Sequence, residues 1–236
     1  MGFGMDESNS LSEGISLYNQ KNYADALTSF LSISTDDVNP VEVAYYVGLC
    51  YSKLERYDDA LLYLEQVVTA EGEMASDLDF QRVLQCRYLL AVIYCTTGRR
   101  KLADFELKQL LDLGYKKASV YASLAFISWE EDNVEKCIEY YNKSLAEDSE
   151  NPTALNGLGY VLANEERDLA RALSYCQKAI AIAPDSSACL DSLGWVYYKM
   201  GLYAESKKYL QLAKQKNPSN KLIDEHLKLV LQEEES

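Results

Sequence analysis

The chain has 236 residues, of which 48% are hydrophobic and 25% are charged, a composition typical of a folded globular protein. Residues 1–118 carry 11 basic and 18 acidic side chains and residues 119–236 carry 12 and 19, so each half has a net charge of −7. Nucleic acids and anionic membrane surfaces are bound by clustered Lys and Arg. The sequence therefore predicts no nucleic-acid partner and no attachment to an anionic membrane surface.

The amino-terminal segment MGFGMDESNS contains neither a cationic region nor an apolar stretch. No apolar run elsewhere approaches the length of a membrane span. We therefore predict a cytoplasmic protein without a direct membrane span. The alternative is a periplasmic or membrane-anchored protein whose N-terminal leader has been removed.

The six cysteines are scattered without a CxxC pair, and the single histidine, His226, is distant from all of them in sequence. This pattern argues against a zinc site and favours thiols buried within helices. The sequence also lacks a glycine-rich phosphate loop, and one histidine gives little chance of a nucleophile–base pair. We therefore predict a protein without catalytic residues, metal or cofactor.

Small residues recur along the chain at a nearly constant interval. One series is Gly14, Gly48, Ala91, Ala125, Gly159 and Gly194, with steps of 34, 43, 34, 34 and 35 residues. A second series is Ala26, Ala60, Ala103, Cys137, Ala172 and Ser206, with steps of 34, 43, 34, 35 and 34 residues. The agreement of two independent series predicts tandem helix pairs, in which the small residues allow the two helices of a pair to approach closely.

In chain order, the predicted repeats span about 7–40, 41–74, 84–117, 118–151, 152–186 and 187–220 in one solenoid domain covering 1–236. The step of 43 residues predicts an insertion over 75–83, which we expect to lie in a turn. Residues 221–235 predict one more amphipathic helix, with Leu222, Ile223, Leu227, Val230 and Leu231 on its apolar face. The total is about thirteen helices and no strands.

The last repeat has Leu190, Leu193, Gly194, Tyr197, Ser206, Leu210, Ala213 and Pro218 in the order and spacing of a known repeat motif. In this pattern the chain resembles the tetratricopeptide repeat (TPR) family. The resemblance implies an all-α fold, a right-handed superhelical solenoid of six repeats with a capping helix. The last two repeats resemble those of bacterial TPR proteins of the cell envelope, which implies a scaffold or adaptor.

The first helix of each repeat is expected to face the concave side of such a stack. The inward stripe is rich in aromatic side chains, and a few polar ones lie on or beside it. The candidate partner-binding residues are Tyr45, Tyr88, Phe126, Trp129, Asn156, Tyr160, Asn164, Asp191, Trp195, Tyr198 and Lys199. Two interpretations stay open for the aromatic residues, a groove for a partner or the core between neighbouring helices.

One TPR subclass clamps a terminal carboxylate with Lys and Asn, or Lys and Arg, four residues apart, and this chain has no such pairs on its inward stripe. We predict a non-catalytic scaffold or adaptor that binds a peptide or helix of one or more partner proteins. Two alternatives remain. One is a binder of a small apolar ligand or lipid in the concave pocket, and the other is a self-assembling structural subunit of a bacterial envelope complex.

Overall fold

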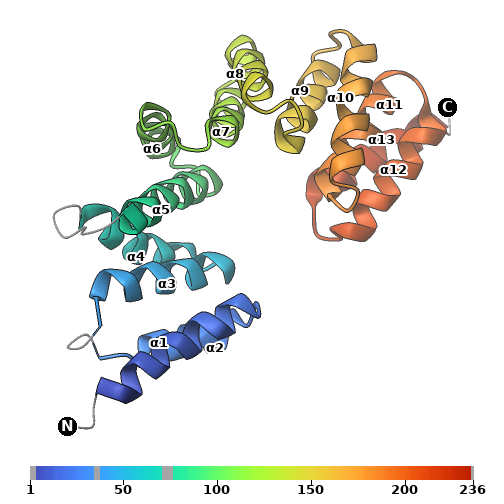
Figure 1. Ribbon diagram of the computed structural model, residues 1–236. Coiled ribbons are helices and arrows are strands. Elements are labelled where there is room, and N and C mark those ends of the chain that lie inside the picture. Colours follow the sequence, from blue (N-terminus) through green and yellow to red (C-terminus); the bar gives the residue numbers. More distant parts are fainter. Residues whose placement is uncertain (1–3, 35–37, 71–76, 235–236) are drawn as a thin grey trace. The chain divides into compact units, whose positions relative to one another are not determined.

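The computed structural model describes residues 4–34, 38–70 and 77–234 (Figure 1). Over these residues it contains thirteen helices and no strand. The helices are α1 (Gly4–Asn19), α2 (Tyr23–Leu31), α3 (Pro40–Lys53), α4 (Tyr57–Thr69), α5 (Asp77–Thr96), α6 (Arg100–Asp112), α7 (Lys117–Glu130), α8 (Val134–Glu147), α9 (Pro152–Asn164), α10 (Leu169–Ile182), α11 (Ser187–Lys199), α12 (Tyr203–Lys216) and α13 (Lys221–Glu234).

The chain divides into two compact units, unit 1 (Met1–Tyr115) and unit 2 (Lys116–Ser236). Unit 1 contains the helix pairs α1–α2, α3–α4 and α5–α6, and unit 2 contains α7–α8, α9–α10 and α11–α12, followed by α13. Within each unit the first helices of successive pairs contact one another. The predicted all-α arrangement of tandem helix pairs is therefore confirmed within both units.

The turn inside every helix pair has the same backbone geometry. A left-handed residue occurs at the equivalent position of each of these turns, and the turn between α9 and α10 has a second one, Asp168. The equivalent residues are Lys21, Glu55, Gly98, Asp132, Glu166 and Gly201. Their spacing of 34, 43, 34, 34 and 35 residues equals that of the first small-residue series. In each turn the N–H of the following residue donates to a carbonyl five residues back, for example Arg56 to Tyr51 at 3.0 Å. This bond closes the helix end in a Schellman motif.

The small residues mark the closest helix–helix contacts. A Cβ atom added to Gly159 would lie 2.5 Å from Cys176 Sγ and 3.0 Å from the Ala172 carbonyl oxygen. In the second series all six side chains are fully buried, at 0% exposure; they are Ala26, Ala60, Ala103, Cys137, Ala172 and Ser206. The two series thus form the facing surfaces of each helix pair, as predicted.

The predicted position of the insertion requires a correction. Residues 77–83 belong to α5, which at 20 residues is the longest helix in the structure's described part, while residues 75 and 76 lie outside that part. The helix extends because its first turns have partners: Val83 is 3% exposed, and Arg82 pairs with Glu42 of α3 at 2.6 Å. The extra residues therefore lengthen a first helix instead of forming only a turn.

The helix α13 closes unit 2 by packing against α12 and α11. Ile223, His226 and Val230 are buried, whereas Leu222 and Leu231, predicted for the apolar face, are each 44% exposed. The difference follows from the 100° advance per residue, because the buried face is centred on residues 223, 226 and 230 and the two leucines flank it. No helix among the described residues is long and apolar enough to span a membrane.

The cysteines are free thiols, and all except the half-buried Cys95 are buried. Burial raises the pKa of Cys50, Cys86, Cys137 and Cys176 to about 12 and that of Cys95 to about 11. The thiols thus serve as small apolar side chains, as the sequence predicts.

Candidate functional site

The first helices of unit 2 bring several candidate residues together. Helix α7 contacts α9, α9 contacts α11, and α11 contacts α13, so their inward stripes lie side by side. Equivalent positions on successive helices, one residue after the small one, are Phe126, Tyr160 and Trp195. Trp129 and Tyr198 lie one turn further along α7 and α11.

These side chains form a continuous chain of ring contacts, which we call the aromatic row: Trp129, Tyr160, His226, Trp195 and Tyr198. Trp129 meets Tyr160 edge-on, with ring centroids 6.1 Å apart. The His226 ring lies 6.3 Å from Tyr160 and stacks on Trp195 at 4.1 Å, and Trp195 stacks on Tyr198 at 5.0 Å. The row therefore runs across four helices, α7, α9, α11 and α13.

The aromatic row is partly open to solvent. Phe126, beside the row, is 44% exposed, and Trp129, Tyr160 and Tyr198 are half-buried. Trp195 is only 7% exposed. The two interpretations of the aromatic stripe thus divide by residue, because Trp195 belongs to the core whereas its neighbours keep a free edge.

Asp191 lies inside the protein rather than on its surface. Its carboxylate oxygen Oδ1 is 2.9 Å from His226 Nδ1, and the two residues are 5% and 3% exposed. The predicted partner contact of Asp191 is therefore corrected to an internal one, since His226 of α13 covers it. Burial, with a smaller contribution from the Asp191 charge, raises the pKa of the Tyr160 hydroxyl.

The sequence places His226 in the predicted capping helix but does not reveal its place in the row. The available signal was spacing: His226 follows Asp191 by 35 residues, and Asp191 follows Asn156 by the same interval. The three residues thus occupy equivalent positions on α9, α11 and α13.

The remaining polar candidates of unit 2, Asn156, Asn164 and Lys199, differ in their hydrogen-bond partners. The Asn156 Oδ1 and Trp195 Nε1 atoms are buried without a hydrogen-bond partner in the described structure. Asn164 donates from Nδ2 to Glu165 Oε1 at 3.3 Å. Lys199 Nζ donates to Glu166 Oε1 at 2.9 Å and lies 5.2 Å from the Trp195 ring centroid.

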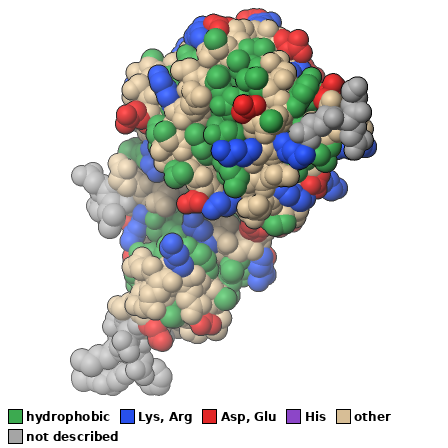
Figure 2. Space-filling model, turned by 90° about the vertical axis from the view of Figure 1, so that its right-hand side faces the viewer, with side chains coloured by type: hydrophobic (Ala, Val, Ile, Leu, Met, Phe, Trp, Pro, Cys, Tyr) green, Lys and Arg blue, Asp and Glu red, His purple; other side chains and the backbone are tan. Residues whose placement is uncertain are grey.

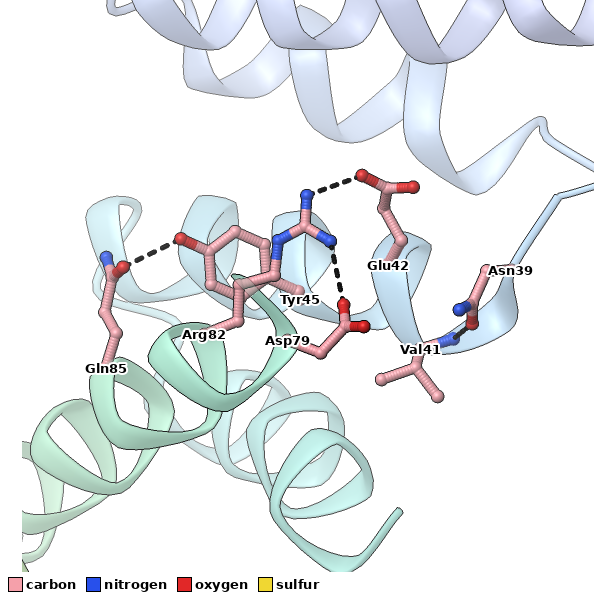
Figure 3. Close-up of polar contacts among 7 residues, drawn as sticks. All are labelled: Asn39, Val41, Glu42, Tyr45, Asp79, Arg82 and Gln85. Atoms are coloured by element: carbon pink, nitrogen blue, oxygen red, sulfur yellow. Dashed lines mark hydrogen bonds and ion pairs between the residues drawn. The ribbon is translucent and has the colours of Figure 1, made fainter. Parts of the chain in front are cut away.

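The candidate Tyr45 of unit 1 belongs to a different set of ring contacts. It meets Tyr46 with ring centroids 5.0 Å apart, and Tyr46 contacts Tyr18 of α1 at 6.4 Å and stacks on Phe30 of α2 at 5.1 Å. Tyr45 is 8% exposed, and its hydroxyl donates to Gln85 Oε1 at 2.8 Å. Arg82 lies beside it, paired with Glu42 and with Asp79 at 3.4 Å (Figure 3). Burial raises the pKa of Tyr45 to about 12. These contacts hold α3 against α5 and leave Tyr45 little surface for a partner.

Tyr88, the second candidate of unit 1, is half-buried and contacts Tyr115 at a ring distance of 6.5 Å. The positions equivalent to Tyr160 are occupied in unit 1 by Ile15, which is half-buried, Leu49, which is buried, and Val92, which is 39% exposed. The ring contacts of unit 1 therefore do not run through these positions.

Apolar side chains are also exposed away from the row. Figure 2 views the molecule from the side where the C-terminal helices lie and shows hydrophobic side chains gathered among charged ones. Exposed apolar residues of α10, α12 and α13 are Ile182, Leu212, Leu222, Leu229 and Leu231. Within the described residues, no three His, Cys, Asp or Glu side chains are grouped as metal ligands would be.

Family models described as "Tetratricopeptide repeat" match residues 11–75, 129–187 and 163–225. A TPR repeat-containing protein of Pseudomonas aeruginosa is 38% identical over 78 residues, which is 33% of this chain and 13% of that protein. The type IV pilus assembly protein PilF of the same bacterium is 29% identical over 125 residues, 52% of this chain and 49% of PilF.

The human protein O-mannosyl-transferase TMTC1 is 23% identical over 189 residues, 79% of this chain and 20% of that protein. The chain thus spans less than half the length of these curated relatives. A crystal structure of a tetratricopeptide repeat protein from Parabacteroides merdae aligns with a TM-score of 0.74 at 15% identity, covering 98% of this chain and 86% of that one. The repeat spacing, the helix pairs and the matching family models agree, and the chain belongs to the tetratricopeptide repeat family.

Proposed function

We propose that the protein is a non-catalytic scaffold that binds a peptide or helix of a partner protein along the aromatic row of unit 2. One observation carries the proposal: Trp129, Tyr160 and Tyr198, from three successive first helices, join one chain of ring contacts while each remains half-exposed. Aromatic side chains that are held rigidly and keep a free edge are the usual anchors of protein interfaces.

The spacing of the row suits a protein segment. Axes of packed helices lie roughly 8–10 Å apart, so anchors on neighbouring helices recur at about that distance. Side chains three residues apart on a polyproline II segment, or seven apart on an α-helix, lie on one face and recur at roughly 10 Å. A segment lying across α7, α9 and α11 can therefore contact each aromatic side chain in turn.

The family membership supports a scaffold role, because TPR domains commonly mediate protein–protein interactions and are generally non-catalytic. The likeness to a named transferase covers 20% of that protein and gives no reason to assign its activity here. The partial likeness to a pilus assembly protein supports a role in a bacterial envelope complex. A cytoplasmic location stays a prediction of the sequence.

The test is a randomised peptide library selected against the intact chain, with recovered peptides titrated by tryptophan fluorescence. Both tryptophans of the chain, Trp129 and Trp195, belong to the row, so the signal is local. The row variant carries Phe126→Ala, Tyr160→Ala and Tyr198→Ala. The matched control removes three exposed apolar side chains from second helices, by Phe105→Ala, Ile182→Ala and Leu212→Ala.

Peptides that lose at least tenfold in affinity for the row variant, but not for the control, would support the proposal. Peptides that bind both variants equally would contradict it and place the interface on another surface. If no peptide binds, two other measurements decide between the alternatives. Binding of an apolar fluorescent ligand tests the hypothesis of a small-molecule or lipid binder. Analytical sedimentation of the concentrated chain tests the hypothesis of self-assembly.

A further inference from the structure

Lys199 shows how the aromatic row holds a positive charge. Its Nζ atom lies 5.2 Å from the Trp195 ring centroid and 2.9 Å from Glu166 Oε1, and the side chain is 19% exposed. An ammonium over an aromatic face is attracted by the ring quadrupole, and the carboxylate adds a charge-assisted hydrogen bond. The repeat thus builds a cation site from a ring on one first helix and a carboxylate in the preceding turn.

The same arrangement recurs one repeat earlier without the cation. The position of Trp195 is taken by Tyr160, that of Glu166 by Asp132, and that of Lys199 by Asn164. Asp132 and Glu166 have the same left-handed backbone, with φ of 56° and 52°. Each also donates its N–H to the carbonyl three residues earlier, at 3.0 and 3.1 Å. The two carboxylates are therefore presented by equivalent turns.

The earlier site lacks a positive partner in the part of the chain that the structure describes. No Lys or Arg pairs with Asp132 or its neighbour Glu131 among the described residues, and both are exposed. Asn164 is neutral and bonds to Glu165. The ring and the carboxylates both favour a cation.

We propose that this place, which we call the Tyr160 site, receives a lysine or arginine side chain of the partner segment. The site comprises Tyr160, Glu131 and Asp132. The inference rests on the proposed function and adds the chemistry of the partner, a basic residue beside apolar ones. The partner's ammonium or guanidinium takes the place at Tyr160 that Lys199 takes at Trp195.

Two wider features favour the same partner. The chain carries a net charge of −14, which attracts basic segments over distances of about a Debye length. The carboxylates also follow the C-terminal end of α7, where the helix dipole is negative and favours cations. Neither feature is specific alone, but both attract a positively charged side chain to the Tyr160 site.

The test uses the peptides recovered by the library selection that depend on the row. Each Lys or Arg in them is replaced by norleucine, which removes the charge and keeps an aliphatic chain. Two protein variants remove the site: Asp132→Asn deletes a carboxylate with a residue that tolerates the left-handed turn, and Asn164→Lys supplies the chain's own cation. Asn164→Gln is the matched control, since it keeps a neutral amide.

We expect one Lys or Arg to recur among these peptides, and its replacement by norleucine to weaken binding about tenfold. Binding should also weaken about tenfold for Asp132→Asn and Asn164→Lys, not for Asn164→Gln, and should fall as NaCl is raised. Row-dependent peptides whose affinity changes less than twofold on norleucine replacement would overturn this inference while the proposed function stands. Peptides that ignore the row would overturn both.

Discussion

The two units share one repeat but use its inward stripe differently. In unit 2 the positions after the small residue carry Phe126, Tyr160 and Trp195, which lie in or beside a continuous series of rings. In unit 1 the equivalent positions carry Ile15, Leu49 and Val92, and the ring contacts lie elsewhere, among Tyr18, Phe30, Tyr45 and Tyr46. The helix pair therefore fixes the fold, whereas the side chains after the small residues decide whether the ring contacts of a unit run through the inward stripe at these positions.

The largest predicted effect comes from the buried link between α11 and α13. His226→Ala leaves the buried Asp191 carboxyl without its partner and should lower the free energy of unfolding by about 3 kcal/mol. The corresponding link of unit 1, removed by Gln85→Ala, should cost about 1 kcal/mol because it is a neutral bond. Urea unfolding followed by circular dichroism measures both.

Equal losses for these two variants would remove the distinction between the two links. The double variant Asp191→Leu and His226→Leu is the control, since replacing both partners by apolar groups should recover much of the stability. Tryptophan fluorescence gives a second readout that is confined to unit 2, where both tryptophans lie.

The small-residue series allows a matched pair of substitutions. Gly159→Ala would place a Cβ 3.0 Å from a backbone carbonyl oxygen that cannot move aside, and should cost about 2 kcal/mol. Gly48→Ala meets the flexible Leu64 side chain at 2.8 Å and should cost less than about 1 kcal/mol, since Ala favours the helix. Thermal unfolding ranks the two, and the reverse order would contradict the packing described for unit 2.

Alkaline pH tests a property that both units share. The folded pKa of the buried thiols, about 12 for Cys86 of unit 1 and Cys176 of unit 2, lies above the ordinary value of 9.0. The unfolded chain therefore loses protons first, so stability is complete below pH 9 and falls between pH 9 and 12. We expect a loss of about 1 kcal/mol per thiol for each pH unit, measured by urea midpoints. A stability that stays constant between pH 9 and 12 would contradict this expectation.

The smallest effects concern the shared turns. Gly98→Ala puts a side chain at φ 74° in open space and should cost about 1 kcal/mol. Glu55→Gly relieves the same conformation at φ 57° and should stabilise by about 0.5 kcal/mol. A thermal midpoint that falls for Gly98→Ala and rises for Glu55→Gly would support the equivalence of the α5–α6 and α3–α4 turns.

The sequence predicts the repeats well because the small residues report a local requirement, the close approach of two helices. Gly159 and Ala172 occupy their slots whatever the rest of the stack does. Exposure is less predictable, because it depends on the next helix. Trp195 and Asp191 have the spacing of surface anchors, but both are buried, and His226 of α13 contacts each of them. The insertion was misplaced because nothing local marks where α5 begins.

The most direct test of the aromatic row uses a photoreactive residue, benzoylphenylalanine, at either of two equivalent positions. Phe126 of unit 2 and Val92 of unit 1 are 44% and 39% exposed and are separated by one repeat of 34 residues. Peptides selected from the random library are irradiated with each variant. We expect cross-links from position 126 and none above background from position 92. Equal cross-linking, or cross-linking from position 92 alone, would contradict it.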